Sequence, residues 1–112
     1  MKSAETLFRS PKTLPEIQAI LLDLKSKIQD QYRVTRLGIF GSYARHEQHQ
    51  DSDLDILIDY VKAPSLVRVV ELRDLLSDRL SMKVDIVTVN GLRIDIKDDV
   101  LSDVIDLWNV ED

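Results

Sequence analysis

The segment from Asp53 to Asp59 restricts the fold more than any other part of the sequence. Its apolar and acidic side chains alternate, and alternate residues of a β-strand point to opposite faces. One face of this strand consists of Leu54, Ile56 and Ile58, and the other consists of Asp53, Asp55 and Leu57. Because an apolar face must be covered, the pattern predicts a sheet with helices packed against one side.

Three further stretches have the three- and four-residue apolar spacing of amphipathic helices. The first begins at Thr13, which forms a capping box with Glu16, and should end near Tyr32. The second begins at Pro64-Ser65, and its apolar side consists of Leu66, Val69, Leu72, Leu76 and Leu80. A last helix is predicted over about residues 97–109, with an apolar face of Val100, Leu101, Val104, Ile105 and Trp108. The simplest location for Trp108 is the core.

Two more strands complete the predicted order α-β-β-α-β-α. They cover Val34 to Phe40 and Lys83 to Val89, and the second closes at the turn pair Asn90-Gly91. Residues 92–96 fit either a strand or the start of a helix. The helix between the second and third strands suggests a βαβ unit, so the predicted fold class is α/β (α+β), with a small mixed sheet flanked by helices. We expect one domain over residues 13–109 after a loose leader at 1–12.

The composition narrows the function classes. The 112 residues include no cysteine, which fits a reducing cytoplasm and excludes a thiolate metal site. No stretch approaches the roughly 20 apolar residues of a membrane span, so no membrane partner is expected. The formal net charge of −5 argues against broad binding to a nucleic-acid backbone.

Three aspartates are candidate metal ligands. Asp53 and Asp55 are two residues apart on one strand, so their side chains share a face with Cα atoms about 6–7 Å apart. Asp85 lies on a later strand and joins them if the two strands pair in register. Carboxylates this close repel one another, and magnesium, which prefers hard oxygen ligands, removes that cost. Three of them can hold two metal ions for an in-line phosphoryl displacement, and Asp85 is also a candidate base.

The segment Gly41-Ser42-Tyr43-Ala44-Arg45 supplies candidate phosphate contacts. A glycine directly after a strand lets a phosphate approach the backbone closely, and the Ser42 hydroxyl adds a donor. Arg45 is a candidate to neutralise charge on a departing pyrophosphate. The spacing of a Walker loop is absent.

At these residues the sequence resembles a known family. Gly41-Ser42, ten intervening residues and then Asp53-Leu54-Asp55 are similar to the GS…DxD motif of the polymerase-β-type nucleotidyltransferase superfamily. The segments GSYAR and SDLDILI resemble in particular those of the minimal nucleotidyltransferases paired with HEPN-domain toxins. The resemblance covers about residues 14–108. Many relatives have a glycine after the arginine, where this chain has His46. A histidine tolerates a positive φ poorly, so the local loop and the aim of Arg45 are expected to differ.

The resemblance implies a polymerase-β-like fold and specific roles. Two magnesium ions would bind Asp53, Asp55 and Asp85, and Gly41 and Ser42 would hold the triphosphate. The implied function is that of an antitoxin, a protein adenylyltransferase that moves AMP from ATP to a tyrosine of a HEPN-type RNase toxin. Little chain remains outside the core to bind an acceptor, which favours an acceptor presented by a partner protein.

Two other functions remain open from the residues alone. One is a catalytically idle antitoxin that neutralises its partner by binding. The other is a nucleotidyltransferase that acts on a small-molecule hydroxyl. Lys62 and Lys83 lie near the predicted site along the sequence, but no pattern assigns a role to either.

Overall fold

The computed structural model describes residues 13–49 and 51–110, so the predicted leader at 1–12 lies outside the described residues. The elements follow in the order α2 (Leu14–Asp23), α3 (Lys25–Tyr32), β1 (Val34–Phe40), β2 (Leu54–Tyr60), α4 (Leu66–Leu80), β3 (Val84–Thr88), the 3-10 helix η1 (Val89–Gly91), α5 (Ile94–Asp103) and β4 (Ile105–Asn109). No helix in this part of the chain has the length and apolar character needed to cross a bilayer.

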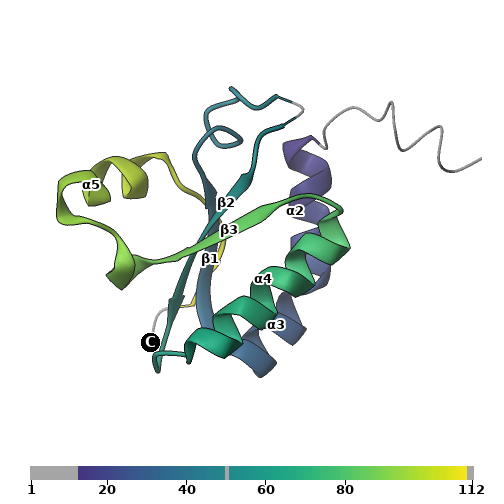
Figure 1. The fold of residues 1–112 in the computed structure, drawn as a ribbon, viewed down its shortest axis with the longest axis vertical. Coiled ribbons are helices and arrows are strands. Elements are labelled where there is room, and N and C mark those ends of the chain that lie inside the picture. Colours follow the sequence, from purple (N-terminus) through teal and green to yellow (C-terminus); the bar gives the residue numbers. More distant parts are fainter. Residues whose placement is uncertain (1–12, 50, 111–112) are drawn as a thin grey trace, which may run out of the picture.

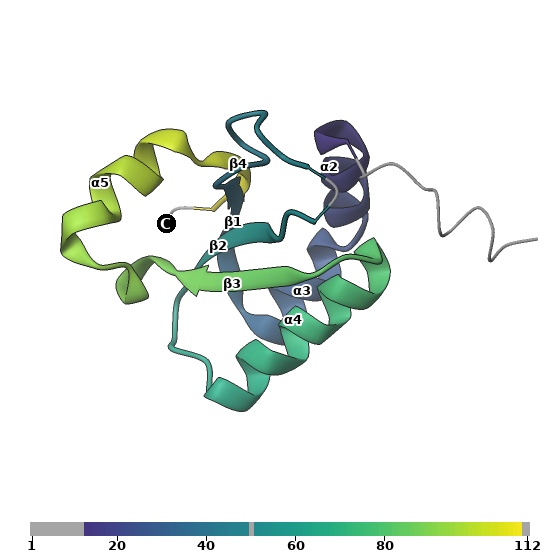
Figure 2. The same cartoon turned by 45° about the horizontal axis from the view of Figure 1, so that its top comes forward.

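The four strands form one mixed sheet in the order β3-β2-β1-β4. β2 and β3 are parallel, while β1 is antiparallel to both β2 and β4. The parallel pair is joined by α4, which is the βαβ unit expected from the sequence. Helices α2, α3 and α4 lie on one side of the sheet and α5 lies on the other (Figures 1 and 2).

The main core lies between the sheet and helices α2, α3 and α4. The predicted apolar face of β2 is buried in it, with Leu54, Ile56 and Ile58 at most 1% exposed. Leu72, Leu76 and Leu80 of α4 face them from the helix layer, whereas Leu66 in the first turn of α4 is exposed. The opposite face of β2, which carries the aspartates, therefore stays outside this core.

The predicted first helix is divided into two. Its start is as expected, because the Thr13 side chain accepts from the Glu16 backbone and the Glu16 side chain accepts from the Thr13 backbone. Leu24 ends α2 with φ −92° and ψ 0°, and α3 begins at the next residue. The apolar stripe nevertheless continues across the break, since Leu21, Leu24 and Ile28 are all buried.

The predicted helix over 97–109 is wrong in its second half. The chain leaves α5 at Val104 with an extended backbone (φ −64°, ψ 137°) and then forms β4 beside β1. Two contacts stabilise this edge strand: Arg36 Nε lies 2.8 Å from Asp106 Oδ1, and Trp108 is buried opposite Leu37. The spacing of the apolar residues fits a helix, but the empty edge of β1 favours a strand. Trp108 is a core residue, as predicted.

Candidate active site

The three predicted metal ligands lie on one face, at the end of the sheet where β1 stops. Asp55 pairs with Phe40, the last residue of β1, and on its other side with Asp85 of β3. Asp53 precedes β2 by one residue and shares the face of Asp55 by strand alternation. The three aspartates, which come from two parallel strands, therefore lie on one face beside the start of the loop after β1, and this face is called the acidic face below.

Asp55 is the most perturbed carboxyl of this group. Its partial burial raises its pKa above the usual range, the negative charges of Asp85 and Asp53 raise it further, and the positive charge of Arg45 lowers it. The negative charge of Asp55 is therefore unfavourable at this position, and a bound cation would stabilise it.

This pKa shift predicts a dependence of stability on pH in the absence of divalent metal. An acid whose folded pKa is raised stabilises the fold below its unfolded pKa, about 3.9 for aspartate, and loses that contribution as pH rises through the folded pKa. Asp55→Asn should therefore match the wild type near pH 3 and become more stable at neutral pH, by up to about 1 kcal/mol because solvent screens a half-buried group. Urea unfolding in EDTA at several pH values measures this difference. A variant that is less stable at pH 7 would contradict the prediction.

Gly41 brings the backbone directly against Asp55. Its φ is +75°, and a Cβ added to it would lie 2.2 Å from Asp55 Oδ2. A side chain here is therefore excluded both by backbone conformation and by the neighbouring carboxylate. Glycine is required at this position so that the loop can approach the acidic group.

The loop after β1 is a compact turn with a buried anchor. Arg45 N–H donates to Gly41 O at 3.1 Å, and Glu47 N–H donates to Ser42 O at 2.8 Å. Tyr43 is 1% exposed and belongs to the main core, and its burial raises the pKa of its hydroxyl. The Tyr43 anchor holds half-buried Ser42 beside Gly41 and the acidic face. Tyr43 was not among the predicted site residues, although an aromatic residue within a polar loop is a signal for such an anchor.

His46 keeps the positive φ that a glycine would have, at +59°. The histidine therefore adopts a left-handed backbone, which costs it more than it would cost a glycine. His46→Gly should raise the free energy of unfolding by about 0.5–1 kcal/mol, because the exposed side chain contributes little packing. His46→Val should lower it by about 1 kcal/mol, since a β-branched residue tolerates this region least. Urea unfolding of both variants tests the pair, and equal stabilities would refute it.

Arg45 lies next to the acidic face but is already paired. Its Nε is 3.1 Å from Glu47 Oε1, and its Nη1 is 3.8 Å from Asp103 Oδ2 at the end of α5. It is also the cation that lowers the pKa of Asp55. The side chain thus links the loop to α5 and lies close enough to Asp55 for its charge to act there. Its role in nucleotide binding stays a prediction.

The two lysines considered with the site separate in the structure. Lys83 Nζ lies 3.9 Å from Asp53 Oδ2, so this residue is part of the acidic face. Lys62 follows the far end of β2, and its expected proximity to the site is wrong, because β2 runs away from Asp53 along its whole length. A lysine two residues before Asp85 shares its face, and this spacing was the signal for Lys83.

The acidic face does not form an enclosed metal-binding site. Within residues 13–49 and 51–110, no three acidic or histidine side chains converge tightly enough to enclose an ion. Like charges move apart when nothing neutralises them, and Asp53 is instead directed towards Lys83. The donor types, three carboxylates on adjacent strands, still match the oxygen ligands that magnesium prefers.

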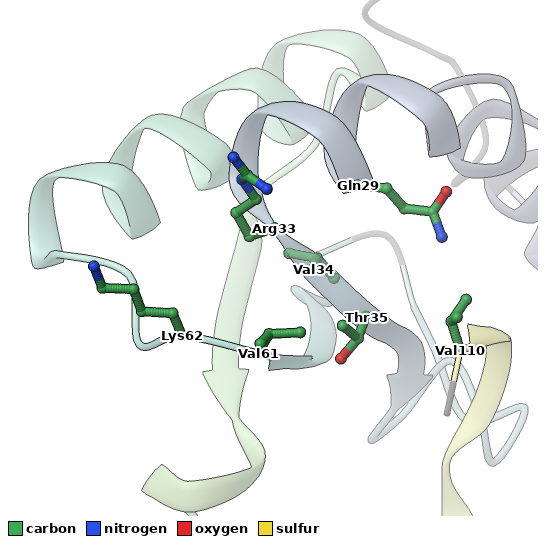
Figure 3. Close-up of a pocket in the computed structure, with 7 residues that line it drawn as sticks. All are labelled: Gln29, Arg33, Val34, Thr35, Val61, Lys62 and Val110. Carbon is green, nitrogen blue, oxygen red and sulfur yellow. The ribbon is translucent and has the colours of Figure 1, made fainter. Parts of the chain in front are cut away.

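A hollow of the described chain lies away from these aspartates. It has a volume of about 650 Å³ and is lined by Gln29, Arg33, Val34, Thr35, Val61, Lys62 and Val110 (Figure 3). These residues surround the start of β1 and the segment after β2, at the opposite end of the sheet from Gly41 and Asp55. Because no carboxylate lines it, this hollow is not the acidic site.

The fold and family comparison define the class of protein. The chain belongs to the polymerase beta nucleotidyltransferase family, whose model matches residues 23–111. This confirms the predicted family, fold class and enzyme class.

Two relatives show which kind of nucleotidyltransferase the chain is similar to. The chain is 49% identical over 81 residues to a candidate protein adenylyltransferase, MJ0126 of Methanocaldococcus jannaschii, covering 72% of this chain and 83% of the relative. It is 40% identical over 93 residues to the protein adenylyltransferase MntA of Thermococcus cleftensis, covering 83% of this chain and 94% of the relative.

Solved structures show the same fold. A structure described as a candidate minimal nucleotidyltransferase superposes with a TM-score of 0.74 and 31% identity, covering 84% of this chain and 95% of the other. An MNT antitoxin in complex with a tri-AMPylated HEPN toxin of Shewanella oneidensis superposes with a TM-score of 0.66, covering 86% of this chain and 72% of the other. At 19% identity the latter likeness concerns the fold alone.

Proposed function

We propose that the chain is a protein adenylyltransferase that acts as an antitoxin by transferring AMP from ATP to a HEPN-type RNase toxin. The observation that carries the proposal is the position of Gly41, directly after β1, against Asp55 of β2, which pairs with Asp85 of β3 and shares a face with Asp53. This arrangement places a phosphate-accessible backbone beside a group of carboxylates. The names of the adenylyltransferase relatives support AMP as the transferred group.

Asp53, Asp55 and Asp85 would hold two magnesium ions, which neutralise the triphosphate and activate the acceptor oxygen. The donor chemistry fits, because all three are hard oxygen ligands and the charge of Asp55 is disfavoured by its neighbours. Gly41 and Ser42 would contact the outer phosphates, and Arg45 would exchange its present partners for the departing pyrophosphate.

The reaction is an in-line displacement at the α-phosphorus of ATP. The acceptor hydroxyl oxygen forms the new bond to phosphorus, the bond from phosphorus to the β-phosphate oxygen breaks, and pyrophosphate leaves with that electron pair. The acceptor proton passes to the Asp85 carboxylate, which is exposed on the same face. The exposed position of Asp85 suits an acceptor side chain presented by another protein in the cytoplasm.

Intact-mass measurement tests the proposal. The chain is incubated with magnesium, ATP and a HEPN-type toxin, and the toxin is expected to gain the mass of one or more AMP groups and to lose RNase activity. Unmodified toxin that is nevertheless inhibited would replace the proposal with neutralisation by binding. Modification of a small-molecule hydroxyl without any protein partner would replace it with the third function considered from the sequence.

A further inference from the structure

Lys83 is placed against Asp53 by the pairing of two strands. Leu54 pairs with Val84 in the parallel ladder, and Leu54 N–H donates to Lys83 O at 2.9 Å. The residues before this pair, Asp53 and Lys83, are therefore neighbours, and their side chains approach to 3.9 Å. The strand register thus sets these two residues side by side.

Lys83 compensates only part of the negative charge on this face. The face carries two adjacent rows, Asp53 with Lys83 and Asp55 with Asp85. These rows hold three carboxylates and one ammonium group. The formal charge of the two rows is consequently negative even with Lys83 present.

The contact between Lys83 and Asp53 is easily exchanged. The Lys83 side chain is 79% exposed and that of Asp53 is 38% exposed, so water and salt weaken their attraction. A divalent cation bound to Asp53 and Asp55 would repel the ammonium group at this distance. The long, flexible stem of lysine allows the ammonium to move away while the backbone stays in the ladder.

We propose that Lys83 is an exchangeable counter-ion of the active site: it neutralises Asp53 in the metal-free chain and moves to the phosphates of the nucleotide once magnesium is bound. The proposal rests on the proposed function, because it assumes that Asp53 holds magnesium. It assigns Lys83 two opposite effects. The residue competes with the metal, and it assists the binding of the metal–nucleotide complex.

Calorimetric titrations of the isolated chain separate these effects without measuring activity. In Lys83→Met, magnesium alone should bind about threefold to tenfold more tightly, because one repelling charge near the metal is removed. AMP-PNP at saturating magnesium should bind that variant about threefold to tenfold more weakly. Lys83→Arg keeps the charge and should stay within about twofold of the wild type in both titrations.

Lys62→Met is the matched control, since it removes the same charge at the opposite end of the sheet. If Lys83→Met equals the wild type in either titration, or if Lys62→Met reproduces its effects, the proposal for Lys83 is overturned while the proposed function stands. If the wild-type chain binds no magnesium, with or without AMP-PNP, both proposals are overturned together.

Discussion

The double variant Asp53→Asn, Asp55→Asn is expected to lose AMP transfer by roughly a thousandfold or more while it still folds and binds its partner. Asparagine preserves the size of each side chain but removes the negative charge that a magnesium ligand needs. Removing two like charges from one face should not harm the fold, because ionised Asp55 is already disfavoured there. Intact-mass measurement of the toxin gives the extent of transfer, and gel filtration of the mixture gives complex formation.

Asp59→Asn is the matched control for this double variant. Asp59 lies on the same strand but pairs with Arg36 of β1, towards the far end of the sheet. The control should transfer AMP at a rate close to that of the wild type. If the double variant still protects cells from the toxin without modifying it, the carboxylates are not the basis of neutralisation and binding alone accounts for it.

Gly41→Ala is expected to cause the second large loss. The left-handed backbone at φ +75° costs an alanine about 1–3 kcal/mol of stability. The new methyl group would also meet Asp55 Oδ2 at 2.2 Å, so either the loop or the carboxylate must shift. Because a displacement of about 1 Å can cost roughly a hundredfold in rate, AMP transfer should fall at least that far even in the folded fraction.

Gly91→Ala provides the comparison for a glycine outside the site. Gly91 lies in η1, where an added Cβ would meet only the Thr88 hydroxyl, at 2.7 Å. This variant should lose some stability and keep its AMP transfer when assayed well below its melting temperature. Equal transfer by the Gly41 and Gly91 variants would show that close approach of the loop to Asp55 is not needed for the reaction.

The acidic face was predictable because its geometry follows from local rules. Strand alternation places Asp53 with Asp55, and the βαβ unit brings Asp85 into register with them. The C-terminal strand was not predictable in the same way, since its apolar residues fit a helical period equally well. The edge of β1 that β4 pairs with, together with the ion pair between Arg36 and Asp106, decides between the two. Side-chain partners such as Glu47 and Asp103 for Arg45 depend on how the loop meets α5 in space.

The acidic face is complete only when strands that lie far apart in the sequence have paired. Asp55 and Asp85 belong to strands that are joined only through α4, and Gly41 reaches them from a third strand. A nascent or proteolysed fragment that ends before β3 would have the glycine loop and two of its carboxylates but not the third. If the three aspartates act as proposed, such a fragment lacks one metal ligand and does not modify an acceptor before the sheet is assembled.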